Sequence, residues 1–143
     1  EAGLPESQWV ERQIGRPVIK VFNSISFTSL AGAGLPVGAP NRVALPVAGD
    51  DRASKAVALA LVDDLGFDGV DAGSLGDSWR QQPGTPVYCT DLDEAHTRQA
   101  LAMADRASAP ARRDRFIEEM LKVERSGGQA DLVALGRSIY GAP

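Results

Sequence analysis

The residues best suited to chemistry in this sequence follow three short apolar runs. These runs end at Asn23-Ser24, at Gly49-Asp50-Asp51 and at Asp71-Ala72-Gly73-Ser74. If the runs are neighbouring parallel strands, their polar ends surround one opening, because ligands of open parallel sheets bind at the carboxyl ends of the strands. Gly73 would let a flat ring or a phosphate approach the backbone. Helix capping explains Asp50 and Asp51 more simply, and a plain turn explains Asn23 and Ser24 equally well.

A second group of candidates lies just beyond the third run, in Ser78-Trp79-Arg80-Gln81-Gln82-Pro83-Gly84-Thr85. Trp79 could stack on a ring, and Arg80 could bind a carboxylate or a phosphate. A structural role explains the pair at least as well, with Trp79 in the core and Arg80 capping a carbonyl.

The usual catalytic constellations are missing, so the sequence predicts no catalytic side chain and no metal site. His96, the only histidine, lies on a charged helical stretch without a nearby nucleophile. Cys89 has no adjacent cation to lower its pKa, which favours a role as a small apolar filler. The acidic residues near position 91 lack the frame of a calcium loop. The glycines at 32 and 34 lack the spacing of a dinucleotide-binding loop.

The elements that must position these residues alternate between strand and helix. Patterns predict a helix over 1–16, a strand over 17–22, a turn of helix at 27–30 and a strand over 42–48. Asp50 or Asp51 and Gly66 bound a clear helix, in which a stripe of Ala53, Ala56, Val57, Ala60 and Leu61 should lie on a sheet. A third strand over 67–71 completes a βαβ unit.

The second part of the chain reads differently, with a short strand or extended segment at 86–89 and then helices. We expect one helix from about 91 to about 108, a break at Ala109-Pro110, a helix over 111–123 and a last helix over 130–140. The fold class predicted is α/β, a partial Rossmann-like parallel sheet of about three strands with a helical C-terminal extension.

Composition excludes several classes of protein. A chain of 143 residues suits one domain. A formal charge of −4 argues against nucleic acid or an anionic membrane as the main partner. A single cysteine excludes an internal disulfide framework. Neither a membrane-spanning run nor a secretory signal is recognisable, so we expect a cytoplasmic protein.

Three segments in this order resemble a known family. They are Val18-Ile19-Lys20-Val21-Phe22-Asn23-Ser24-Ile25, Ala44-Leu45-Pro46-Val47-Ala48-Gly49-Asp50-Asp51 and Leu65-Gly66-Phe67-Asp68-Gly69-Val70-Asp71-Ala72-Gly73-Ser74-Leu75. Over about residues 7–90 the chain resembles the second half of the NADPH-dependent deazaflavin (coenzyme F-420) reductase-like family, the F-420-dependent NADP oxidoreductases. The reductase domain of the six-transmembrane ferric reductases is similar.

The resemblance implies a Rossmann-type domain that transfers hydride between NADP(H) and a flavin or deazaflavin. Catalysis would consist mainly of positioning the two rings, which needs no acid–base residue. The expected cofactor-binding residues are Phe22, Asn23, Ser24, Ile25, Asp71, Gly73, Ser74 and Leu75 around the rings, with Trp79 and Arg80 on the flavin side.

One part of the family pattern is missing, because its glycine-rich loop and first βαβ half would precede Glu1. The chain opens at Glu1 without a Met, and we expect a truncated domain. Residues 1–90 would be the second half of the reductase domain and 91–143 a helical extension packed on it. NADP would bind only with the missing half, so this chain alone should be inactive.

The alternative is a non-catalytic α/β module for interaction or oligomerisation that lacks the dinucleotide-binding half. Its open sheet edge would carry Val18, Ile19, Val21 and Phe22. Such edges are usually covered. We therefore expect a homodimer that covers this edge, or residues 92–140 wrapped over the sheet.

Overall fold

Two short parallel strands form the centre of the structure, a computed structural model described over residues 3–143. Strand β1 (Ala44–Val47) pairs with β2 (Asp68–Asp71), with Ala44 beside Asp68 and Val47 beside Asp71. Helix α3 (Arg52–Asp64) connects them, so the βαβ unit is confirmed. The α/β fold class with C-terminal helices is likewise confirmed.

The expected strand over 17–22 is wrong. This segment contributes only an antiparallel bridge between Lys20 and Ala48. The backbone of Phe22 has φ 61°, a left-handed conformation that turns the chain away from an extended path. In the part of the chain that the structure describes, the sheet therefore has two strands instead of about three.

Local signals set the bounds of α3. The Asp51 carboxylate accepts a hydrogen bond from the Ser54 amide at 2.7 Å, which caps the first turn. Past its end, Gly66 has φ +92°. A Cβ atom at Gly66 would also lie 2.8 Å from the Gly34 backbone. Both the left-handed conformation and this close approach therefore require glycine at position 66.

The face of α3 that contacts the sheet differs from the predicted one. Ala58 and Val62 are its buried residues, whereas Val57 is 70% exposed and Leu61 47% exposed. A two-stranded sheet is narrow, so it covers one row of the helix only, and the predicted stripe faces outward. This expectation was wrong in the orientation of the helix.

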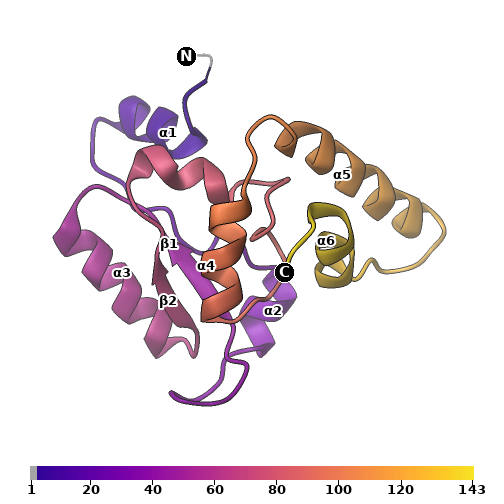
Figure 1. Ribbon diagram of the computed structural model, residues 1–143, viewed down its shortest axis with the longest axis horizontal. Helices are drawn as coiled ribbons and strands as arrows, with labels where there is room; N and C mark the ends of the chain where they lie inside the picture. The colour runs from indigo at the N-terminus through magenta and orange to yellow at the C-terminus, as the bar shows by residue number, and fades with distance from the viewer. Residues whose placement is uncertain (1–2) are drawn as a thin grey trace.

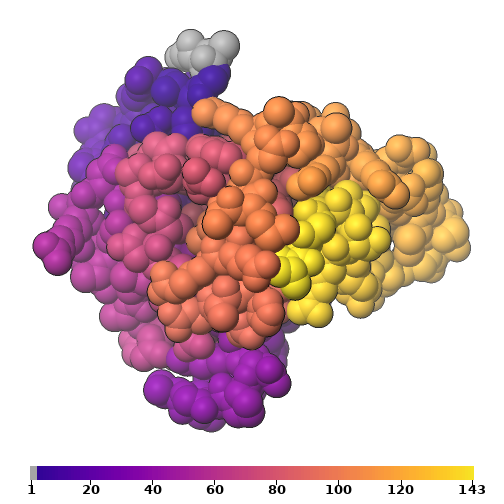
Figure 2. All heavy atoms as spheres, viewed as in Figure 1, coloured from indigo at the N-terminus to yellow at the C-terminus, as the bar shows by residue number. Residues whose placement is uncertain are grey.

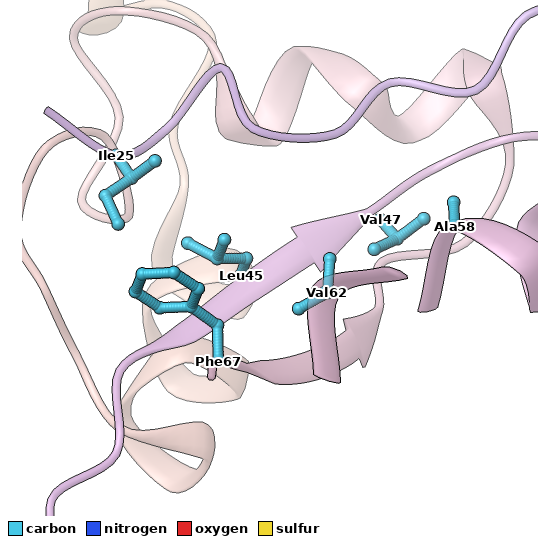
Figure 3. Close-up of a cluster of buried hydrophobic side chains, with 6 residues drawn as sticks. All are labelled: Ile25, Leu45, Val47, Ala58, Val62 and Phe67. Carbon is cyan, nitrogen blue, oxygen red and sulfur yellow. The ribbon is translucent and has the colours of Figure 1, made fainter. Parts of the chain in front are cut away.

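Apolar side chains fill both sides of the sheet. On the α3 side lies a cluster of Ile25, Leu45, Val47, Ala58, Val62 and Phe67 (Figure 3). On the other side lies a cluster of Ala44, Val70, Val87, Leu92, Ala100 and Leu101. The last two residues belong to α4 (Glu94–Met103), which packs against both strands.

The remaining elements surround this centre (Figure 1). They are α1 (Glu6–Ile14), α2 (Phe27–Gly32), the 3-10 helix η1 (Leu75–Gln81), α5 (Ala109–Arg125) and α6 (Leu132–Tyr140). Figure 2 shows α4 in orange across the middle of the visible face, with the yellow α6 beside it. Within residues 3–143, none of the helices has the length and apolar character needed to cross a membrane.

Two helix boundaries in the C-terminal part differ from the expected ones. The helix expected to run to about residue 108 ends at Met103. The Ala109-Pro110 pair, expected to break a helix, instead starts α5, with Pro110 in its first turn. Proline is tolerated there because a first-turn amide has no partner within the helix.

Candidate functional site

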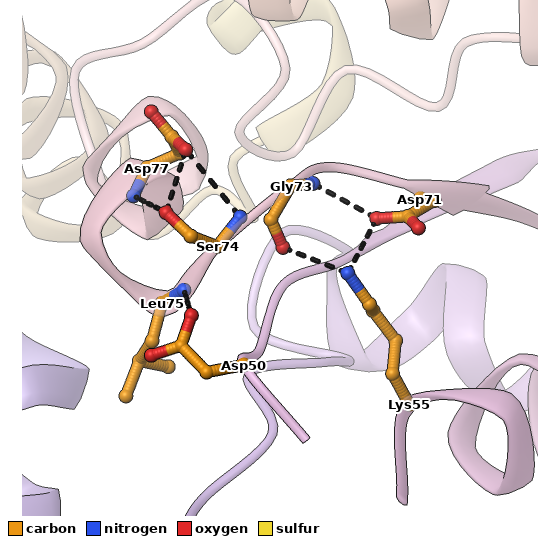
Figure 4. Close-up of polar contacts among 7 residues, drawn as sticks. All are labelled: Asp50, Lys55, Asp71, Gly73, Ser74, Leu75 and Asp77. Carbon is orange, nitrogen blue, oxygen red and sulfur yellow. Dashed lines mark hydrogen bonds and ion pairs between the residues drawn. The ribbon is translucent and has the colours of Figure 1, made fainter. Parts of the chain in front are cut away.

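The carboxyl ends of β1 and β2 lie side by side. The Gly49 amide, just after β1, donates to the Gly73 carbonyl, just after β2, at 3.2 Å. Figure 4 shows the polar groups that gather at this edge of the sheet. The structure thus brings Asp50, Asp71, Gly73 and Ser74 together, at the edge where ligands of parallel sheets bind.

An ion pair organises the end of β2. Lys55, in the first turns of α3, places its Nζ 2.8 Å from Asp71 Oδ1 and 3.0 Å from the Gly73 carbonyl. The Gly73 amide also donates to Asp71 Oδ1 at 2.9 Å. The hydrogen bond from Lys55 holds the pKa of Asp71 below its usual value. Asp71 is therefore a fixed carboxylate at neutral pH and not a proton donor.

The next residues start η1. Ser74 Oγ lies 2.7 Å from Asp77 Oδ2, and the two residues form a reciprocal capping box (Figure 4). Asp50 accepts a hydrogen bond from the Leu75 amide at 3.0 Å. Asp50 thus fixes the entry to η1, whereas the sequence indicated a helix cap. The polar groups of Ser74 and Asp50 are already used in local bonding.

Asn23 is held by a residue that sequence reasoning did not select. Its Nδ2 donates to the Gln81 carbonyl at 2.6 Å, and Gln81 Nε2 donates back to Asn23 Oδ1 at 3.0 Å. Gln81 is fully buried and also donates to the carbonyls of Lys20 and Pro46. The partners are 58 positions apart, so no local signal could have revealed the pair.

The other predicted ring-binding residues lie deeper. Ser24, Ile25 and Leu75 are buried, at 4%, 7% and 0% exposure. Phe22 is half-buried and packs against the cluster that contains Ile25. The chain runs antiparallel to β1 from the bridge between Lys20 and Ala48, so Ile25 lies beside Leu45 and Phe67, toward the amino end of β1 (Figure 3). The prediction that the segment 22–25 joins Asp71, Gly73 and Ser74 at one opening is therefore wrong, and the latter three form an exposed edge without it.

Arg80 lines a cavity of about 490 Å³ at the end of β2, together with Asp71, Ala72, Arg98 and Leu101. Arg80 Nη1 donates to the Leu101 carbonyl at 3.2 Å, which is the carbonyl-capping role considered from the sequence. Arg98 comes from α4, where it is paired with Glu94 at 2.7 Å. Sequence reasoning missed Arg98, because its neighbours suggested only a solvated helix face.

Trp79 faces a different cavity from Arg80. It lines a hollow of about 520 Å³ with Arg106 and Arg113. The guanidinium groups of Arg80 and Arg106 lie 4.7 and 5.7 Å from the centroid of its ring. Such contacts are cation–π interactions. The predicted flavin-side pair is therefore split between two cavities.

The histidine and the cysteine are poorly placed for catalysis at this edge of the sheet. His96 Nδ1 lies 2.8 Å from Asp93 Oδ1 at an exposed helix start. Burial raises the pKa of Cys89 to about 11, so its thiol is neutral at physiological pH. Across residues 3–143, no group of three or more His, Cys, Asp or Glu side chains could hold a metal ion.

Comparison with known proteins gives one clear relative. The chain is 39% identical over 105 residues to the protein YjhV of Escherichia coli (strain K12), a match that covers 73% of this chain and 77% of YjhV. No family model matches the sequence. A crystal structure of a candidate F-420-dependent NADP reductase from Arthrobacter sp. FB24 is 25% identical with a TM-score of 0.43. That match covers 52% of this chain and only 33% of the reductase, so the chain spans about a third of its length. On the strength of the first match, the chain belongs to the same protein family as YjhV.

Proposed function

We propose that this protein supplies the flavin- or deazaflavin-binding part of an oxidoreductase that transfers hydride between NADP(H) and that cofactor. The observation that carries the proposal is the cavity of about 490 Å³ at the carboxyl end of β2, lined by Arg80 and Arg98. The cavity is open to solvent on one side, so it would cover one face of a ring and leave the other free. Its position is where parallel sheets hold their ligands. The order of sequence motifs supports the same cofactor class.

The donors at this cavity fit such a ring. Guanidinium groups are planar donors suited to carbonyl and phosphate oxygens, which flavins and deazaflavins carry. Ala72 and Leu101 provide apolar wall for the ring itself. The negative charge of Asp71 is offset by Lys55, and that of Glu94 by Arg98, so Arg80 is the charged group of this lining without an acidic partner among residues 3–143.

The turn between β1 and α3 is unsuited to a dinucleotide phosphate. A pyrophosphate needs free amides at a helix N-terminus. Here Asp50 and Asp51 bring two carboxylates to that position, and Asp51 already accepts from the Ser54 amide. The phosphates of NADP(H) would therefore be bound by residues other than these. If the phosphates are bound elsewhere, the strand ends are left to bind a ring.

The chemistry expected of the site is modest. When bound, the flavin or deazaflavin ring supplies the position that accepts or gives hydride. The side chains of this chain would orient the ring and exclude water from one side of it. Arg80 and Arg98 would fix its polar edge, and Leu101 would pack against it. Orientation alone accounts for a large part of catalysis in such reactions.

A binding titration tests the proposal. FMN and coenzyme F-420 are added separately to the protein, and ring fluorescence is followed. We expect saturable binding, weakened about tenfold by Arg80→Gln or Arg98→Gln, since loss of one charge-assisted contact costs about 1.4 kcal/mol. Arg113→Gln, which lines the other cavity, is the matched control and should leave binding unchanged.

The outcome that would overturn the proposal is equally definite. If neither ring binds saturably up to about 1 mM, where binding free energy falls to about −4 kcal/mol, the cavity is not a cofactor site. Equal loss in all three variants would also contradict it, because the effect would then be one of net charge. Melting curves recorded alongside confirm that the variants fold.

A further inference from the structure

A second cavity lies apart from the proposed cofactor site. It has a volume of about 520 Å³ and lies between α1, η1 and the start of α5. In Figure 1, α1 and the start of α5 are at the same end of the molecule. We call it the Trp79 cavity, and its lining includes Glu6, Trp79, Pro83, Arg106, Pro110 and Arg113. Among the described residues, none lines both this cavity and the one that contains Arg98.

Two arginines beside the indole ring give the Trp79 cavity its positive charge. The Arg106 guanidinium lies 5.7 Å from the centroid of the Trp79 ring and donates to the Gly3 carbonyl. Arg80 lies 4.7 Å from the same centroid. Within residues 3–143, neither arginine has an acidic partner. Two cations without a counter-charge therefore contact one wall of the cavity.

The acidic residues around the cavity are already bound to other groups. Asp114 lies 2.7 Å from Arg113. Asp105 accepts hydrogen bonds from the Ala107 and Ser108 amides, just before α5. The acidic residue of the lining, Glu6, is paired with Lys20. The charge that remains is positive, which favours an anionic ligand.

Glu6 covers a buried ammonium group. The Lys20 side chain is 6% exposed, and its Nζ is 3.6 Å from Glu6 Oε2, which is too far for a hydrogen bond. No other acceptor in the described part of the chain bonds to this Nζ. Burial lowers the pKa of Lys20, because the charged form has lost its hydration. An anion that approached Nζ to about 2.8 Å would supply the missing hydrogen bond.

The Glu6 carboxylate occupies the position that a ligand carboxylate would take. Its side chain is 70% exposed and belongs to the first turn of α1, so it can turn toward solvent without disturbing the core. Lys20 would then face the cavity.

The rest of the wall suits a flat apolar body. Trp79, Pro83 and Pro110 contribute rings, and Ala109 contributes a methyl group. A ligand with a ring and one carboxylate would therefore match both the apolar wall and the charge of the cavity.

We propose that the Trp79 cavity binds an aromatic monocarboxylate. The ligand carboxylate displaces Glu6 and pairs with Lys20, while Arg106 stabilises its charge. The ring packs against Pro83 and Pro110. This site is separate from the cofactor cavity, and the proposal does not depend on the cofactor.

Benzoate is the probe that tests this proposal, and Trp79 reports its binding. The chain has two tryptophans, so Trp9→Phe leaves Trp79 as the only source of tryptophan fluorescence. We expect a saturable change in fluorescence with a Kd of about 1 mM or below. Benzamide has the same ring without the charge, and inorganic phosphate has charge without a ring. Each should bind at least about tenfold more weakly than benzoate.

Three variants in this background separate the roles of the side chains. Arg106→Gln should weaken benzoate binding about tenfold, because it removes a cation that has no counter-charge. Glu6→Gln should tighten binding at least about threefold, because a neutral amide competes less well for Lys20 than a carboxylate does. Arg115→Gln is the matched control: Arg115 is an exposed arginine of α5 outside the lining, and its replacement should leave the Kd unchanged.

Thermal melting provides a second measurement that also shows whether each variant folds. Benzoate should raise the Tm of Glu6→Gln more than that of the parent protein, because a ligand stabilises the folded state according to its affinity. No saturable binding of benzoate up to about 20 mM, far above the Kd expected, would overturn the proposal. So would equal affinity for benzamide or for phosphate. If Glu6→Gln bound benzoate no more tightly, Glu6 would not occupy the carboxylate position.

Discussion

Substitution of Gly84 by alanine tests how the C-terminal helices are joined to the α/β centre. Gly84 follows η1, and its backbone has φ +95°. A Cβ atom there would lie 2.0 Å from the carbonyl oxygen of Ala109 and 2.7 Å from its carbonyl carbon. Both atoms belong to the backbone at the start of α5, so no side-chain rotation can relieve the overlap. The start of α5 would have to move.

The expected cost has two parts. A left-handed conformation costs a residue with a Cβ roughly 1–2 kcal/mol, offset in part by the stiffer unfolded chain. Overpacking against a fixed neighbour adds about 1–3 kcal/mol. We therefore expect Gly84→Ala to reduce the free energy of unfolding by about 2–4 kcal/mol, from a total of about 5–15 kcal/mol. At about 4 °C per kcal/mol, Tm should fall by about 8–16 °C.

Gly127 supplies the matched control. Its φ is +79°, also left-handed, but nothing lies within 4 Å of the position of its Cβ. Gly127→Ala therefore carries the conformational cost alone, about 1 kcal/mol, or about 4 °C in Tm. Thermal unfolding followed by circular dichroism measures both variants. Equal losses would refute the reasoning, because they would show that α5 does not press on Gly84.

Three further predictions concern the core, the cysteine and a helix cap. Phe67→Ala should lower the free energy of unfolding in urea by about 3–5 kcal/mol, since Phe67 is fully buried. Phe27→Ala should change it by less than about 0.5 kcal/mol, because Phe27 is 72% exposed; similar losses would contradict this. Because burial raises the pKa of Cys89 to about 11, a disulfide reagent at pH 8 should label it only after unfolding, and rapid labelling of native protein would argue against that burial. Hydrogen bonds from Ser54 lower the pKa of Asp51, so its stabilising effect is complete above its unfolded pKa and disappears as the pH falls. Asp51→Asn should lose less stability than the wild type between about pH 6 and pH 3, and an unchanged loss would exclude this role.

Elements that depend on neighbouring residues were predictable from the sequence. Asp51 and Gly66 bound α3 through interactions with adjacent backbone, so the βαβ unit followed from local signals. The orientation of α3 did not, because it is apolar on two faces and its local sequence does not decide which one packs on the sheet. Pro110 was ambiguous for a different reason, since proline both ends helices and begins them.

The candidate site shows the same division. Topology alone predicted that Asp71 and Gly73 would lie at the ligand-binding edge. The hydrogen bonding of each side chain depends on residues far away in the sequence. Asn23, for example, is hydrogen-bonded to Gln81, 58 positions further on. Arg98 reaches the edge only because α4 packs on β2, a contact that its own charged surroundings do not suggest.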